Sequence, residues 1–365
     1  MLKFVRSQPV LFAAFIAAAI SAFFVPPDAR YGEYMNLPVL TELFALMAAV
    51  AGLRSAGLFE RATGLITRRA KDIRRAGLFL IILCMLSAAV VTNDVALITF
   101  VPLTLLIFGD TAHRSSLILI IVLETAAANL GGMLTPVGNP QNLFLYDRYS
   151  LTPLVFISTM LPAGILCLAV LLILTLLLPK APYPAPKTDS VPLDGKKAAV
   201  FGLLFVICLL TVFKVIPFAV CLAAALLLSL AADRKVLLRV DYPLLVTFVF
   251  FFVFSGNIAR VDSVNAFLSR VLTGRETAVS AAVSQFISNV PAAVMLSGFT
   301  EKGTLLLKGV NIGGFGTPVA SLASLISLQF YRKSAGADTK RFMLIFSAVN
   351  FGLLFLLLAA EHFVF

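Results

Sequence analysis

Two short stretches of the chain carry the polar, helix-breaking residues that can bind an ion or a small solute. Residues 129–142 read Asn-Leu-Gly-Gly-Met-Leu-Thr-Pro-Val-Gly-Asn-Pro-Gln-Asn, and residues 311–319 read Asn-Ile-Gly-Gly-Phe-Gly-Thr-Pro-Val. Asn, Gly, Gly, Thr, Pro and Val recur in both at a constant spacing of 182 residues (311 − 129). Glycine weakens a helix by about 1 kcal/mol and proline by about 3. We therefore expect both stretches to interrupt helices.

Broken helices supply backbone ligands as well as side chains. In lipid every freed N–H and C=O group needs a partner, so irregular backbone is tolerated only where it is buried in protein or lines a cavity. Amino-terminal helix ends favour anions, whereas carboxyl-terminal ends and unwound carbonyls suit Na⁺. Asparagine and threonine side chains add neutral donors and acceptors, and glycine lets a ligand approach the backbone. Matching breaks in two halves indicate a transport site; the structural alternative is a pair of kinks that serve packing.

Two shorter polar interruptions precede the breaks. Thr92–Asp94 divides the apolar run 76–109, and Ser288-Asn289 divides the run 277–300. Each apolar arm is shorter than the roughly 20 residues that cross a bilayer. We therefore predict two re-entrant helical hairpins with these polar residues at their tips.

The two tips and the two breaks are expected to converge on one site that binds substrate and ions. Most of its candidate residues are neutral side chains and glycines, because these offer oxygen ligands and close approach to the backbone. The candidates are Thr92, Asn93, Asp94, Asn129, Gly131, Gly132, Thr135, Pro136, Gly138, Asn139, Ser288, Asn289, Asn311, Gly313, Gly314, Gly316, Thr317 and Pro318.

Three carboxyl groups within apolar segments need separate interpretation. A carboxylate in the middle of the membrane costs roughly 2.5–3.5 kcal/mol on insertion scales. Asp94 either caps the helix that begins after it or binds a cation or proton, and the two roles are compatible. Glu124 either takes part in coupling or hydrogen-bonds a neighbouring helix. Glu42, nearer a helix end, is expected to be structural.

Composition places the chain among polytopic membrane proteins. It is 60% hydrophobic and 13% charged, with a mean hydropathy of +1.00. The net charge of +11 resides in basic loops between apolar segments, which argues against a nucleic-acid partner. The four cysteines lie in apolar stretches without metal-ligand spacing, and no phosphate-binding GxxxxGK[ST] motif is present. We expect the lipid bilayer as a partner and no cofactor other than a coupling cation, Na⁺ or H⁺.

The chain divides into two halves of the same plan. We predict a first repeat at 1–178, a cytoplasmic linker at 179–197 that is rich in proline and lysine, and a second repeat at 198–365. Each half contains a hairpin (76–109 and 277–300) followed by a broken helix. The broken helices span 115–146 and 303–331. Polar stretches before the hairpins, 54–75 and 257–276, are expected to lie in the membrane interface.

Orientation follows from the distribution of lysine and arginine. The two broken helices and the remaining apolar segments give nine predicted spans in total. The first span is at 9–25, which we interpret as a membrane helix and not as a signal peptide. With the amino terminus in the cytoplasm, 21 of the 29 basic residues lie in cytoplasmic segments. The two halves then have opposite orientations, which predicts inverted repeats and a carboxyl terminus on the outside. We expect a multi-pass protein of a bacterial-type inner membrane.

At the tips and breaks the chain resembles the ion transporter superfamily, which includes citrate and dicarboxylate symporters, arsenite permeases and certain Na⁺/H⁺ antiporters. The resemblance rests on Thr92–Asp94, 129–142, Ser288-Asn289 and 311–321, in that order. It implies an all-α protein of two inverted repeats with re-entrant hairpins and discontinuous helices, a homodimer, and elevator-type movement. It also implies Na⁺ sites near Asn93 and Asn289, with substrate between the tips.

The tips depart from the pattern of the dicarboxylate symporters, which resemble Ser-Asn-Thr at both positions. Here the first tip ends in Asp94 and the second is followed by Val290. We expect a secondary transporter of a small anion, a carboxylate or an inorganic oxyanion, coupled to Na⁺ or H⁺. The Asn-Asp tip keeps open the alternative of an arsenite efflux permease or a Na⁺/H⁺ antiporter. A passive channel and a membrane enzyme are less consistent with paired hairpins and with the absence of a catalytic motif.

Overall fold

The computed structural model describes residues 9–59, 61, 70–109, 114–182 and 192–363. Within these ranges the chain is helical and contains no strand, which confirms the all-α fold class. Seven of the described helices are long and apolar enough to cross a membrane: Leu37–Ser55, Ile73–Val91, Ser115–Met133, Pro153–Thr175, Gly195–Val212, Tyr242–Ala259 and Thr339–Phe363.

In the first half, three described helices precede a hairpin and a broken helix. The helices are α2 (Pro9–Phe24), α3 (Arg30–Glu33), α4 (Leu37–Ser55), α6 (Ile73–Val91), α7 (Asn93–Phe108), α8 (Arg114–Met133), α9 (Pro140–Arg148) and α10 (Pro153–Thr175). Side-chain caps define several starts: Asn36 accepts from the Val39 N–H, and Thr152 accepts from the Val155 N–H.

In the second half, five described helical segments precede a hairpin and a broken helix. Its elements are α11 (Gly195–Val212), α12 (Phe218–Asp233), the short 3₁₀ helix η1 (Arg234–Arg239), α13 (Tyr242–Ala259), α14 (Asp262–Leu272), α15 (Glu276–Ile287), α16 (Asn289–Leu296), α17 (Gly303–Ile312), α18 (Leu322–Arg332) and α19 (Thr339–Phe363). Asp194 and Asp241 cap α11 and α13 by accepting from the Lys197 and Leu244 N–H groups.

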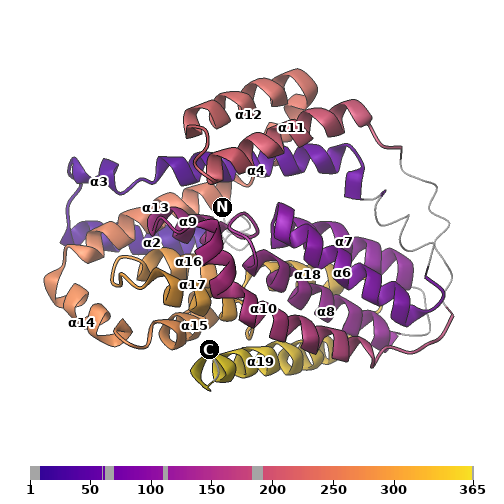
Figure 1. Cartoon of the computed structure of the whole chain (residues 1–365). Coiled ribbons are helices and arrows are strands. Elements are labelled where there is room, and N and C mark those ends of the chain that lie inside the picture. The colour runs from indigo at the N-terminus through magenta and orange to yellow at the C-terminus, as the bar shows by residue number, and fades with distance from the viewer. Residues whose placement is uncertain (1–8, 60, 62–69, 110–113, 183–191, 364–365) are drawn as a thin grey trace.

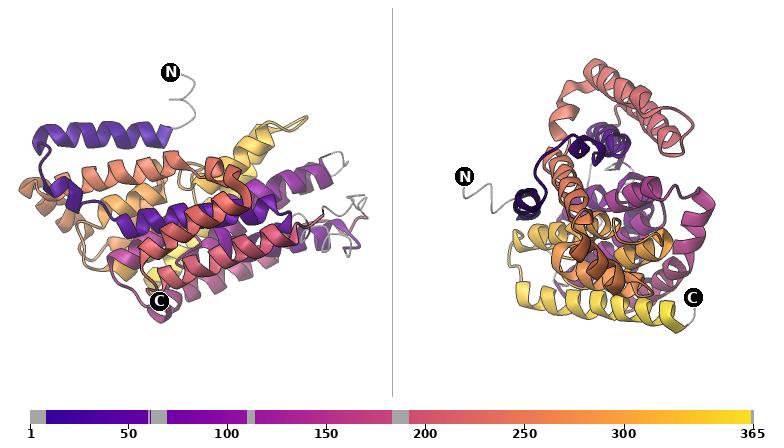
Figure 2. Two further views of the ribbon diagram at one scale, coloured as in Figure 1. Left: turned by 90° about the horizontal axis from the view of Figure 1, so that it is seen from above. Right: turned by 90° about the vertical axis from the view of Figure 1, so that its left-hand side faces the viewer.

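The helices form two groups (Figure 1). The scaffold helices are α2, α4, α11, α12 and α13; α4 packs against α11 and α12, and α2 packs against α13. The hairpin bundle comprises α6–α10 and α15–α19, in which α6 packs on α8 and α15 packs on α17. In Figure 2 the α11–α12 pair and α19 lie on opposite faces of the molecule. The polar tips and breaks lie within the hairpin bundle.

The first arm of the first hairpin is longer than the sequence led us to expect. α6 begins at Ile73 instead of Ala76, because Asp72 accepts a hydrogen bond from the Arg75 N–H, and its 19 residues are sufficient for a span. Arg74 donates to the Leu178 and Leu176 carbonyls at 2.7 Å each, so it caps α10 instead of facing the interface. The prediction that each hairpin arm is too short to span the membrane is therefore wrong for α6. A hairpin is indicated instead by the one-residue turn and by the packing of α7 on α6.

The other predicted segments map onto the structure with small shifts. The predicted spans at α2 and α12 are 16 residues each and shorter than the seven full-length helices. The second interfacial stretch, 257–276, contains the end of α13 and all of α14. Residues 60 and 62–69 of the first interfacial stretch and residues 183–191 of the linker lie outside the described residues.

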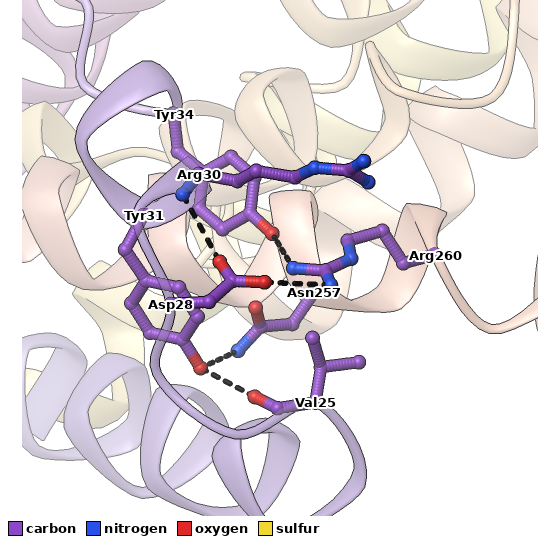
Figure 3. Close-up of polar contacts among 7 residues, drawn as sticks. All are labelled: Val25, Asp28, Arg30, Tyr31, Tyr34, Asn257 and Arg260. Atoms are coloured by element: carbon purple, nitrogen blue, oxygen red, sulfur yellow. Dashed lines mark hydrogen bonds and ion pairs between the residues drawn. The ribbon is translucent and has the colours of Figure 1, made fainter.

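A polar cluster anchors the segment after α2 to the end of α13 (Figure 3). The Asn257 side chain donates to the Tyr31 hydroxyl at 2.7 Å, and this hydroxyl donates to the Val25 carbonyl at 2.6 Å. The Arg260 guanidinium contacts Asp28 at 2.8 Å and the Tyr34 hydroxyl at 2.9 Å. These contacts hold the first helix of the chain against the second half.

Candidate functional site

Each hairpin turns at a single residue with a positive φ angle. Thr92 has φ 98° and ψ 146°, and Ser288 has φ 76° and ψ 154°, so the two tips share one unusual backbone conformation. The residue that follows begins the second arm. The Asn93 N–H donates to the Gly138 carbonyl at 3.1 Å, and the Asn289 N–H donates to the Ala320 carbonyl at 2.9 Å. Each tip is therefore bonded to the break of its own half.

The breaks lie where the repeated motif predicts them. α8 ends at Met133 and α9 begins at Pro140, whereas α17 ends at Ile312 and α18 begins at Leu322. Close approach of backbone requires glycine at the first break: a Cβ on Gly138 would lie 2.5 Å from the Gly132 carbonyl oxygen. In the second break Gly316 has φ 103°, a conformation that favours glycine.

Threonines of the two motifs hold the breaks against the hairpin arms. The Thr135 hydroxyl donates to the Ala89 carbonyl at 2.5 Å, and the Thr317 hydroxyl donates to the Gln285 carbonyl at 2.8 Å. The threonines are related by the spacing of 182 residues, and the two acceptors by the spacing of the tips, 196 residues (289 − 93). The two halves thus repeat the same contact.

Asparagines join the two breaks to each other. Asn129 Oδ1 accepts from Asn93 Nδ2 at 3.1 Å and from the Ser321 hydroxyl at 3.0 Å, and Asn129 Nδ2 donates to the Gly314 carbonyl at 3.2 Å. Asn311 Nδ2 donates to Asn142 Oδ1 at 2.7 Å. The four predicted elements are therefore brought together, and Asn129, in the first break, bonds both the first tip and the second break.

A cavity of about 660 Å³ opens beside the first tip and the first break. Its lining from the hairpin bundle includes Thr92, Asp94 and Asn139, and the scaffold helices contribute Arg54 from α4 and Asp241 from the start of α13. The Arg54 guanidinium also donates to the Ile98 carbonyl of α7 at 3.2 Å. The cavity therefore lies between the two groups of helices and contains charges of both signs.

Two oxygens on this cavity have no hydrogen-bond partner. Asp94 Oδ1 and Asn139 Oδ1 are both buried atoms without a donor in the described structure. Most buried polar atoms in folded proteins have a hydrogen-bond partner, so an unpartnered oxygen beside a cavity is available to an ion, a water or a ligand. Carboxylate and amide oxygens are suitable ligands for a hard cation such as Na⁺. These two oxygens of the first half therefore fit a cation such as Na⁺ as ligands.

A second cavity, of about 510 Å³, lies at the other ends of the same scaffold helices. It is lined by Asn36 and Pro38 at the start of α4 and by Phe252 and Gly256 in the second half of α13. The first cavity reaches instead the end of α4 and the start of α13. The two cavities thus occupy opposite ends of the contact between the scaffold helices and the hairpin bundle.

The remaining predicted residues have structural surroundings. Glu124 is fully buried in α8; Thr104 donates to its Oε1 at 2.6 Å, and its Oε2 has no partner among the described residues. It lines neither cavity and contacts neither tip. Glu42, also buried, lies within α4. Gly131 packs against the Met85 carbonyl of α6, and Gly313 packs against α15 at Ala281 and Ser284.

Several contributors are not among the residues predicted from the sequence. Arg54 lies in the stretch predicted to be interfacial, Asp241 is a helix cap, and Asn142 lies at the end of the first motif. Gln285 lies three residues before the second tip, in the arm α15. The signal that points to it is a long amide side chain one turn before the asparagine of the second tip.

The geometry agrees with comparisons to known proteins. The family model described as citrate transporter (CitMHS) matches residues 4–301. The chain belongs to the citrate transporter family. It is 34% identical over 306 residues to the uncharacterized transporter MJ0456 of Methanocaldococcus jannaschii, with 83% of each chain covered. It is 31% identical over 319 residues to the inner membrane protein YbiR of Escherichia coli, with 84% of each covered.

Two further similarities are more limited. The silicon efflux transporter LSI3 of rice is 27% identical over 139 residues, which cover 38% of this chain and 28% of that protein. The crystal structure of the YdaH transporter of Alcanivorax borkumensis, described as having an unusual topology, aligns with a TM-score of 0.54 at 16% identity. That alignment covers 92% of this chain and 87% of YdaH, and it shows a shared fold. This member of the citrate transporter family is an integral membrane transporter.

Proposed function

We propose that the protein is a secondary transporter of a small anion, either a carboxylate or an inorganic oxyanion. Its transport is coupled to the gradient of Na⁺ or H⁺ across the membrane. The observation that carries the proposal is the cavity at the first tip, where Asp94 and Asn139 present unpartnered oxygens. The hydrogen bonds of Asn129 tie this cavity to the second break. We call the two tips and the two breaks together the polar centre. An ion bound at the first half would thereby influence the whole polar centre.

The arrangement of the two cavities supports an elevator mechanism. They lie at opposite ends of α4 and α13, so sliding of the hairpin bundle along these helices would expose the polar centre to either side. In this proposal the scaffold helices also form the homodimer, the halves are inverted repeats, and the amino terminus is cytoplasmic in an inner membrane.

Uptake into proteoliposomes tests the transport proposal. The purified protein should accumulate a labelled carboxylate or oxyanion when a Na⁺ or H⁺ gradient is imposed. Asn93→Ala and Asn289→Ala each remove a tip side chain, and both should reduce uptake by about tenfold or more, equivalent to about 1.4 kcal/mol. Uptake that is unchanged in both variants would contradict the proposal.

Efflux is a second candidate function, and Asp94 favours it. A carboxylate on the cavity wall repels substrates that carry several negative charges. The similarity to a rice silicon efflux transporter is consistent with export of a less charged solute, such as arsenite, and Na⁺/H⁺ antiport is the related alternative. Export predicts metalloid resistance, and antiport predicts pH-dependent Na⁺ movement. Either should be abolished in Asp94→Asn, and normal activity of that variant would exclude this role for Asp94.

A further inference from the structure

The second break is filled by a side chain from its own hairpin arm. Gln285 Nε2 donates to the Gly313 carbonyl at 2.8 Å, to the Ala281 carbonyl at 3.0 Å and to the Phe315 carbonyl at 3.1 Å. The carbonyls of Gly313 and Phe315 are freed where α17 ends. Unwound carbonyls of this kind are the ligands that broken helices in transporters offer to Na⁺.

The orientation of the Gln285 amide is determined by its partners. Its Oε1 accepts from the Thr317 N–H at 2.9 Å, and a backbone N–H can only donate. Its nitrogen faces three carbonyl oxygens, which can only accept. Rotating the amide by half a turn would place oxygen against three oxygens and nitrogen against an N–H. The amide therefore acts as the donor to the carbonyl cluster.

The first half has no such donor at the corresponding position. The repeated contact between threonine and hairpin arm relates Gln285 to Ala89, since Thr135 donates to the Ala89 carbonyl as Thr317 donates to that of Gln285. Alanine ends in a methyl group and donates no hydrogen bond. The carbonyls equivalent to those bound by Gln285 belong to Met85, Gly131 and Met133. Of these, the Gly131 carbonyl accepts from the Leu134 N–H at 3.2 Å, and no side-chain amide of the described residues donates to any of the three.

The first break also contains a side-chain amide, that of Asn142, but it donates to other carbonyls. Asn142 Nδ2 donates to Gly132 at 2.8 Å and to Thr135 at 3.3 Å. Neither carbonyl is the counterpart of one bound by Gln285, because the counterparts of Gly132 and Thr135 are Gly314 and Thr317. The Asn142 amide is therefore not an equivalent of the Gln285 amide.

We propose that the Gln285 side-chain amide takes the place of a bound cation in the second half, so that this transporter carries one coupling-cation site, in the first half beside Asn93. The inference deepens the proposed function and rests on its cation coupling. The Gly313 and Phe315 carbonyls do not fit a cation, because the Gln285 amide occupies the lone pairs that a metal ion would need. The expectation of two equivalent Na⁺ sites is thereby replaced by one ion site and one permanent internal donor.

The test measures the melting temperature of the purified full-length protein in detergent, with NaCl replaced stepwise by choline chloride at constant ionic strength. A ligand that binds the folded state raises the melting temperature with a saturable dependence on its concentration. The wild type should show one saturable Na⁺ response. Ala89→Gln, which places an amide in the first half, should abolish it. Gln285→Ala should melt several degrees lower in choline and gain a second saturable Na⁺ response.

Several outcomes would overturn the inference. Two Na⁺ components in the wild type, or an unchanged melting temperature and Na⁺ response in Gln285→Ala, would each contradict it. If Gln285→Ala cannot be purified, Gln285→Glu replaces it: the side chain keeps its length but loses its donors, so its stability should depend strongly on Na⁺. A Gln285→Glu protein that is insensitive to Na⁺ would contradict the inference.

The same experiment separates this inference from the proposed function. A wild type without any Na⁺ response contradicts sodium coupling. The role of Gln285 is then decided by the Na⁺ response of the Gln285→Ala variant. In that case a Na⁺ response gained by Gln285→Ala still supports the internal donor, and its absence overturns it.

Discussion

The Ser321 hydroxyl donates a hydrogen bond to Asn129 Oδ1 across 3.0 Å, and both residues are buried. The contact joins the helix breaks of the two halves, which are 192 residues apart in the chain. Asn129 also accepts from the first tip and donates to Gly314, so it is the side chain through which the polar centre is connected.

Removing Asn129 should therefore destabilise the protein more than removing Ser321. Asn129→Ala leaves several buried groups unpaired, at about 1–3 kcal/mol for each. Ser321→Ala removes one donor, and the double variant should show a coupling energy of about 0.5–3 kcal/mol. Unfolding in detergent, followed by circular dichroism, measures these values. Ser158→Ala, on the exposed face of α10, is the control and should change stability by less than about 0.5 kcal/mol. Strictly additive effects would show that the two side chains are not coupled.

Asp94 and Asp241 line the same cavity, but only Asp94 is expected to be required for coupling. Asp241 accepts from the Leu244 N–H as a helix cap, whereas Asp94 Oδ1 has no partner in the described structure. Asp94→Asn should lower cation-driven transport by about tenfold or more, or about 1.4 kcal/mol. Asp241→Asn keeps a capping oxygen and should retain coupling. Equal losses in the two variants would assign the effect to cavity charge in general.

Movement of the hairpin bundle should break the contacts of Asp147. This residue lies in α9, and it accepts from Asn36 at 2.7 Å and pairs with Lys214 at 3.3 Å, both of which belong to the scaffold side. A bifunctional mercury reagent should crosslink Asn36→Cys with Asp147→Cys in a cysteine-free background and stop transport, and a reducing thiol should restore it. Crosslinking that leaves transport intact would show that α9 and α4 do not move apart.

The ion pair of Asp28 and Arg260 predicts a pH-dependent contribution to stability (Figure 3). The hydrogen bond from Arg260 lowers the pKa of Asp28 below its ordinary value of 3.8. A lowered pKa in the folded state stabilises the protein above the ordinary pKa, and this contribution is lost as the pH falls through the folded-state pKa. Asp28→Asn should therefore lower the melting temperature at pH 7, and the difference from the wild type should shrink below about pH 4. A difference that is constant with pH would contradict this assignment.

Much of the fold follows from local signals. Apolar length, the proline and glycine of the breaks, and the polar tips located nearly every helix, because each signal acts within a few residues of its effect. The start of α6 was misplaced although Asp72 is a good helix cap. Arg74 and Arg75 were interpreted as interfacial, and the partners of Arg74 lie more than 100 residues away, at the end of α10.

The site was less predictable because its contacts are non-local. The repeated motif identified the tips and breaks but not their mutual partners, such as Asn311 with Asn142 or Asn129 with Gly314. Arg54 lines the cavity from α4 and donates to the Ile98 carbonyl of α7, which lies 44 residues further along the chain. Gln285 becomes informative only when its amide is seen among three carbonyls. Such pairings depend on the packing of helices that are distant in sequence.

Thr92 and Ser288 adopt a backbone conformation in which glycine would be more favourable, at a cost of about 1–3 kcal/mol for each residue. The chain thus retains hydroxyl side chains at its two hairpin tips, although they lower its stability. Thr92→Gly and Ser288→Gly should raise the melting temperature while they lower transport, so selection for thermostability and selection for activity would act in opposite directions at these two positions. A library screened for each property separately should enrich glycine at the tips in the first screen and deplete it in the second.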